Sequence, residues 1–70
     1  MEPAERFGKN LKAARETLGL SQEALGERAG LHVTEISRLE RAVREPRLGT
    51  IAALAQALGT SASRLVDGIP

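Results

Sequence analysis

The chain has 70 residues, one of them aromatic, and a formal net charge of +1 at pH 7. A chain of this length buries only about 60% of its unfolded surface, which allows one domain with a small aliphatic core. It contains no cysteine, which excludes disulfides and thiolate metal sites, and no apolar run approaches the ~18 residues that a membrane span requires.

The first predicted element is a helix over about residues 4–18. Its apolar residues recur at spacings of four, three and four, namely Phe7, Leu11, Ala14 and Leu18. Pro3 suits the first turn of a helix, and Gly19 is typical of a residue that ends one.

Two short helices joined by a sharp corner follow, over about 22–29 and 33–41. Ser21 is placed to cap the first of them, and Gly30 accepts the positive φ that the corner needs. A side chain at Gly26 would hold the two helices apart, so its absence lets them cross closely. A steep pair of helices joined through a short glycine-containing turn is the helix-turn-helix, a DNA-binding motif.

The second helix of this pair has one apolar side and one polar to cationic side. At 100° per residue, Ile36 and Leu39 define the buried direction, and Glu40 lies near it. The opposite side carries Val33, Thr34, Ser37, Arg38 and Arg41. Arginine can pair with guanine in the major groove, and threonine or valine methyls can contact the thymine methyl. An ordinary solvated helix face has a similar composition, and the corner and the nearby arginines favour DNA binding.

Positive charge collects on and after this helix. Residues 28–47 contain five arginines against three glutamates, and three of the arginines lie in the linker 41–47. Arginines beside a base-contacting helix would lie over the phosphate backbone, where contacts orient a protein without specifying sequence. A solvated charged loop is the alternative interpretation.

The remaining elements complete a single all-α domain over residues 1–70. Residues 48–58 are apolar on nearly every side, which is typical of a central buried helix and too short for a membrane span. Ser61 is expected to cap a last short helix over about 62–66.

The chain resembles the phage repressor and Cro type of helix-turn-helix domain, the XRE family. The motifs that carry the resemblance are L-G-L-S-Q-E-A-L at 18–25, A-G-L at 29–31, I-S-R-L-E-R at 36–41 and A-Q-A-L-G-T-S at 55–61. The resemblance implies a compact five-helix bundle of the lambda-repressor-like type. It also implies a homodimer that binds palindromic double-stranded DNA operators.

The resemblance implies roles for individual positions. The base-reading positions are Val33, Thr34 and Arg38, with Ser37 nearby. The phosphate-contacting positions are Gln22, Arg41 and Arg44, and His32 is an additional candidate at a helix start. On local grounds, a solvated first-turn residue is the alternative interpretation of Gln22. Arg15 and Glu40 match an ion pair between the first helix and the end of the third.

Three positions depart from the family pattern. His32 replaces the usual Ser or Thr cap, Ala42 stands where glycine usually ends the third helix, and Arg47 replaces a frequent serine cap. Each departure is expected to weaken a helix boundary by up to about 1 kcal/mol.

The function expected from these residues is sequence-specific DNA binding by a cytoplasmic transcriptional regulator of the repressor or controller type. The alternatives are the DNA-binding antitoxin of a toxin–antitoxin pair, and a protein-interaction module without DNA affinity. The single His32 cannot form a catalytic pair or a multi-histidine metal site, so we expect no enzyme, cofactor, metal or small-molecule substrate. Leu65 and Val66 are expected to return to the core, and the dimer interface is expected near the last helix, with Leu65, Val66 and Ile69 as candidates.

Overall fold

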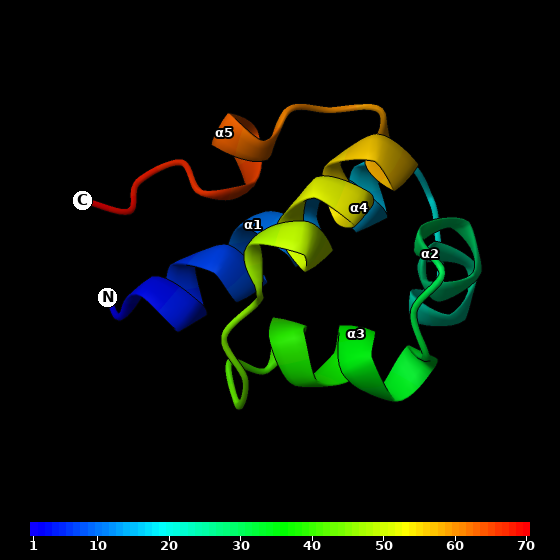
Figure 1. The fold of residues 1–70 in the computed structure, drawn as a ribbon, viewed down its shortest axis with the longest axis horizontal. Helices are drawn as coiled ribbons and strands as arrows, with labels where there is room; N and C mark the ends of the chain where they lie inside the picture. The colour runs from blue at the N-terminus through cyan, green and yellow to red at the C-terminus, as the bar shows by residue number, and fades with distance from the viewer.

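The computed structural model describes residues 1–70 and contains five helices and no strand (Figure 1). The helices are α1 (Pro3–Thr17), α2 (Gln22–Ala29), α3 (Val33–Glu40), α4 (Leu48–Leu58) and α5 (Ala62–Leu65). The prediction of an all-α bundle of five helices is confirmed. The bounds of α2 and α4 agree with the expected ones, α3 and α5 end one residue earlier than expected, and α1 both begins and ends one residue earlier. None of the helices is both long and apolar enough to cross a membrane.

Local hydrogen bonds explain where most of the helices begin. Pro3 is the first residue of α1, and the Glu2 N–H donates to the Glu5 carboxylate at 3.1 Å. The Ser21 hydroxyl accepts from the Ala24 N–H at 3.0 Å, as predicted for the start of α2. Ser61 caps α5 in the same way. At the start of α4 the Arg47 side chain makes no cap bond, in agreement with the expected weakness there.

Ala42, which follows the end of α3, has a backbone conformation that alanine does not favour. Ala42 has a φ of +61°, and it is the only non-glycine residue in the left-handed region. The Ala42 N–H donates to the Leu39 carbonyl at 3.2 Å, and the Val43 N–H donates to the Arg38 carbonyl at 3.1 Å. These two bonds form a Schellman cap, in which glycine normally occupies the left-handed position.

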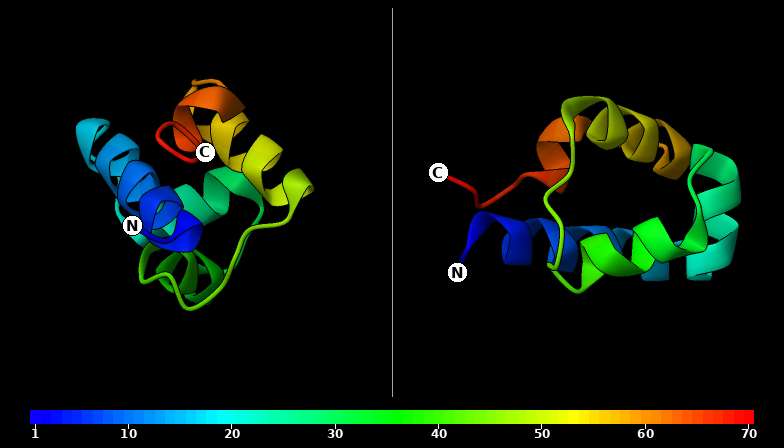
Figure 2. Two further views of the ribbon diagram at one scale, coloured as in Figure 1. Left: turned by 90° about the vertical axis from the view of Figure 1, so that its left-hand side faces the viewer. Right: turned by 60° about the horizontal axis from the view of Figure 1, so that its bottom comes forward.

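The helices surround a small core and leave α3 at the edge of the molecule. α1 packs against α3 and α5, α2 packs against α3 and α4, and α4 packs against α5. Figure 1 shows α3 along the lower edge with no helix beyond it, and the second view of Figure 2 brings the same helix to the front. One long side of α3 therefore has no packing partner within the chain.

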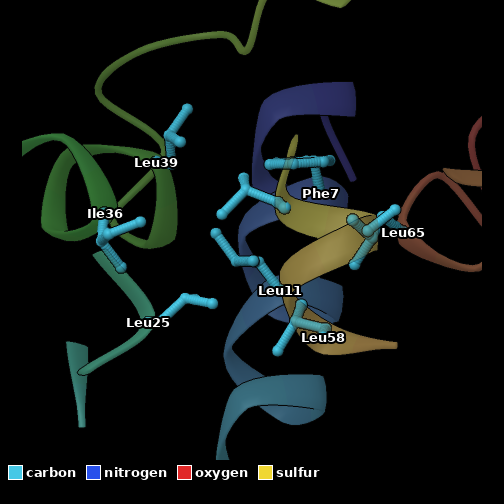
Figure 3. Packing of buried hydrophobic residues seen from close by; sticks show 9 residues of the cluster. Phe7, Leu11, Leu25, Ile36, Leu39, Leu58 and Leu65 are labelled. Carbon is cyan, nitrogen blue, oxygen red and sulfur yellow. The ribbon is translucent and has the colours of Figure 1, made fainter. Parts of the chain in front are cut away.

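Every helix contributes at least one side chain to the core. The buried apolar residues are Phe7, Leu11, Leu25, Ile36, Leu39, Leu54, Ala55, Leu58 and Leu65. Those labelled in Figure 3 point from the five helices toward a common centre. Leu65 is only 1% exposed, which confirms that it belongs to the core and leaves its side chain unavailable for the expected dimer interface.

Two glycines allow the helices to approach closely. A Cβ atom on Gly26 would lie 2.6 Å from the Leu31 carbonyl oxygen in the corner before α3, in agreement with the predicted close approach of the two helices. A Cβ atom on Gly8 would lie 2.7 Å from the carbonyl oxygens of Leu39 and Glu40. Because the obstacles are backbone atoms, neither glycine can be replaced without moving a helix. No local pattern in the sequence indicates the second contact.

Candidate nucleic-acid interface

The two sides of α3 differ in burial as the sequence predicts. Ile36 and Leu39 are fully buried, whereas Thr34 and Arg38 are exposed. Val33 and Ser37 are half-buried and lie at the borders between the two sides. The four residues predicted to contact bases therefore all keep some exposure on a helix that lies at the edge of the molecule.

The predicted ion pair between Arg15 and Glu40 is present. The Arg15 Nε and Nη2 atoms donate to the two Glu40 carboxylate oxygens at 2.6 and 3.0 Å. The side chains are 11% and 4% exposed, so both charges are nearly removed from water. The hydrogen bond to Glu40 raises the pKa of Arg15, against the lowering effect of burial. Arg15 also donates through Nη1 to the Leu20 carbonyl at 2.8 Å, which ties the α1–α2 connection to the same site.

Gln22 belongs to this cluster as well. Its Nε2 atom donates to Glu40 Oε1 at 3.0 Å, and the residue is half-buried. The description of Gln22 as a merely solvated residue is therefore wrong. The bond uses one of its two amide N–H groups, so the second N–H and the amide oxygen stay available to a ligand at the start of α2. The sequence did not indicate the bond because its two residues lie 18 positions apart.

His32 forms the N-terminal cap of α3. Its Nδ1 atom accepts a hydrogen bond from the Thr34 N–H at 3.0 Å. The expectation that His32 leaves this boundary weakened is wrong, because the ring nitrogen supplies the acceptor that serine or threonine would otherwise supply. The ring is exposed.

The arginines on α3 and in the segment after it are all at the surface. Arg38 on α3 and Arg41, Arg44 and Arg47 after it are exposed. Arg41 donates from Nε to the Ser37 hydroxyl at 3.1 Å, which brings these two predicted site residues together on one turn. Because Glu40 is neutralised inside by Arg15, residues 28–47 present five arginines against only Glu35 and Glu45. The surface beside α3 is therefore more cationic than the net charge of the chain indicates.

Sequence reasoning also missed a contact that holds the end of the chain. The Asn10 side-chain amide on α1 donates to the carbonyl oxygens of Leu65 and Asp67 at 3.0 and 2.9 Å. A polar residue on an amphipathic helix carries no signal for partners more than 50 positions away, so no pattern could have identified this bond.

The chain matches known proteins over most of its length. Residues 11–65 match the HTH_3 family, described as Helix-turn-helix. The chain is 41% identical over 66 residues to the control protein C.SmaI of Serratia marcescens, an alignment that covers 94% of this chain and 79% of that protein.

Solved structures share the fold. The restriction-modification controller protein C.AhdI from Aeromonas hydrophila is 35% identical, with a TM-score of 0.87 over 89% of this chain and 94% of that chain. The P22 c2 repressor, solved in complex with synthetic operator 9T, is also 35% identical, with a TM-score of 0.82 and the same coverage.

These relatives are DNA-binding transcription regulators and not enzymes. The family match over residues 11–65 includes the whole α2–α3 pair and the exposed Arg38 on α3. The chain therefore belongs to the HTH_3 family of helix-turn-helix proteins and is a DNA-binding transcriptional regulator.

Proposed function

We propose that this regulator inserts α3 into the major groove of a palindromic operator. The observation that carries the proposal is the division of α3 into a side that belongs to the core and a side that faces outward at the edge of the molecule. On the outward side, Arg38 would pair with a guanine edge, and Thr34 would contact an adjacent base. Val33 and Ser37, at the borders, would contribute a methyl contact and a hydroxyl contact.

The residues around α3 would bind the phosphate backbone. Gln22 lies at the start of α2, where free backbone N–H groups and the helix dipole favour an anion. Arg41 and Arg44 follow α3 and are exposed, and His32 precedes it. Contacts on both ends of α3 would set its depth and direction in the groove.

A homodimer would be needed because one copy of α3 spans only a few base pairs. An eight-residue helix is about 12 Å long, which matches the rise of roughly three to four base pairs. So few base pairs recur too often in a genome to define one site. Two copies related by a two-fold axis would double the sequence that is read and would require half-sites about 34 Å apart.

Selection of bound DNA from a random pool, with the full chain, tests this function. We expect enrichment of a palindrome with half-sites separated by about one helical turn. Recovery of DNA without any shared sequence would contradict specific binding. Sedimentation equilibrium of the protein with the selected DNA then tests the stoichiometry, and a complex with one protein chain per site would contradict the dimer.

We further propose that the regulated genes belong to a restriction–modification system. The support is the identity to C.SmaI over 94% of this chain and the likeness to C.AhdI, which is described as a restriction-modification controller protein. The proposal expects the selected operator beside genes for a methyltransferase and an endonuclease, with the protein acting on DNA in the cytoplasm. If the neighbouring genes encode a toxin, the antitoxin alternative replaces it.

A further inference from the structure

We propose that His32 is a positioning residue for the DNA-contacting end of α3, and that it acts only while Nδ1 of its ring is unprotonated. The inference rests on the proposed function, because it matters for DNA only if Thr34 contacts a base. Its structural part, the dependence of the cap on the protonation state of one ring atom, stands independently of DNA.

The geometry of the cap fixes where the ring carries its proton. Nδ1 lies 3.0 Å from the Thr34 backbone nitrogen and accepts its hydrogen. A neutral imidazole has one N–H group and one acceptor nitrogen. Because Nδ1 is the acceptor, the proton of the neutral ring must be on Nε2. The cap therefore selects one tautomer and leaves the Nε2–H as the only donor of the ring.

Protonation of the ring removes the cap. With hydrogens on both nitrogens, Nδ1 and the Thr34 N–H are both donors and cannot bond. The added positive charge also lies at the N-terminal end of α3, where the helix dipole disfavours it. Serine, threonine or asparagine at this position would cap the helix without any such dependence.

No charged partner compensates for this change. The charged residues nearest to His32 in the chain are Glu35, in the first turn of α3, and Arg28, in the last turn of α2. Neither forms an ion pair with the ring, since Arg15–Glu40 is the one ion pair in the structure. His32 is also the only histidine of the chain, and histidine is the residue type whose charge can change in the physiological pH range.

Loss of the cap and gain of charge have opposite effects on DNA binding. The loosened first turn of α3 would place Thr34 less well against a base, which lowers affinity for the operator. A cationic ring attracts any phosphate, which raises affinity for all DNA. As the pH falls, the ratio of operator affinity to non-specific affinity should therefore fall.

The structural part is tested on the free protein. Long-range proton–nitrogen NMR at about pH 8, where imidazole is ordinarily neutral, should show the hydrogen of His32 on Nε2. The Thr34 amide hydrogen should exchange faster at about pH 5.5 than the intrinsic pH dependence predicts, and this extra acceleration should be absent in His32→Asn. A hydrogen on Nδ1 at the higher pH would overturn the proposal.

The functional part compares the wild type with His32→Asn, which caps without titrating, and His32→Ala, which does not cap. For the wild type, the ratio of operator affinity to non-specific affinity should fall about fivefold between about pH 8 and 5.5. For His32→Asn this ratio should be the same at both pH values. For His32→Ala it should be low at both pH values. A pH dependence that persists in His32→Asn would overturn the proposal. Absence of operator preference in all three proteins at both pH values, with the NMR result as expected, would instead refute the proposed function.

Discussion

The guanidinium of Arg15 on α1 and the carboxylate of Glu40 at the end of α3 are joined by two parallel hydrogen bonds, 2.6 and 3.0 Å long. The same arginine binds the Leu20 carbonyl, and the same carboxylate accepts from Gln22. Three helices and one connection therefore meet at a single buried pair. The end of α3, which directly precedes the exposed Arg41 and Arg44, is held from inside the molecule.

Glu40→Gln should destabilise the protein by about 3 kcal/mol, because it leaves the buried Arg15 charge without its counterion. Urea unfolding followed by circular dichroism measures the change. Because the pair raises the pKa of Arg15, the stabilisation is fully present below the ordinary arginine range and is lost only above it. The effect of the substitution should thus be the same at neutral and at mildly alkaline pH.

The double substitution Arg15→Met with Glu40→Gln provides the control. Removal of the unpaired charge should recover part of the stability lost by Glu40→Gln alone. Equal or larger loss in the double variant would show that the charge itself is not the cause.

Gly26→Ala should destabilise the protein by about 1–2 kcal/mol, although alanine favours helices. The added Cβ atom would meet the Leu31 carbonyl oxygen at 2.6 Å, so α2 or the corner must move. Thermal unfolding measures the change. Gly49→Ala is the matched control, because its Cβ meets nothing within 4 Å in α4, and it should stabilise by about 0.5–1 kcal/mol. Similar effects at both positions would contradict the close crossing.

Ala42→Gly should stabilise the protein by about 0.5–1 kcal/mol. The φ of +61° strains an alanine, and the relief exceeds the entropy that glycine costs in the unfolded chain. The midpoint of urea unfolding should rise without a change in slope. Ala52→Gly, at an exposed position within α4, should lower stability by a similar amount.

Arg38→Ala should weaken operator binding by about 1–3 kcal/mol and relax selectivity at one base pair. Binding to the selected operator and to variants at each position measures both effects. An equal loss on every sequence would exclude a base contact. Arg44→Ala, an exposed arginine outside α3, is the comparison. It should weaken binding to all DNA and lower the salt slope by about 0.9, and an unchanged slope would remove it from the phosphate contacts.

The helices and the inner residues of the site were predictable because their signals are local. The apolar spacing of α1, the serine at the start of α2 and the apolar stretch of α4 each indicate structure within a few residues. The inward direction of Glu40 followed from helical periodicity, since it lies near the side defined by Ile36 and Leu39.

The missed contacts are those whose partners are distant or unusual. Gly8 leaves space for carbonyl groups more than 30 positions away along the chain. Asn10 donates hydrogen bonds to carbonyl groups more than 50 positions away. The cap from His32 was missed for a different reason, because a histidine at a helix start gives no local indication of which ring nitrogen faces the backbone. Leu65 was expected both in the core and near an interface, because an apolar residue in a short last helix fits either, and its side chain lies in the core.

The division of α3 into an inner and an outer side has an evolutionary consequence. Thr34 and Arg38 contribute almost nothing to the interior, whereas Ile36, Leu39 and Glu40 contribute nothing to the outer side. Mutations at the proposed base contacts Thr34 and Arg38 can therefore accumulate with little loss of folding stability. A duplicated copy of this gene could acquire a new target through two or three substitutions while the rest of the chain stays unchanged.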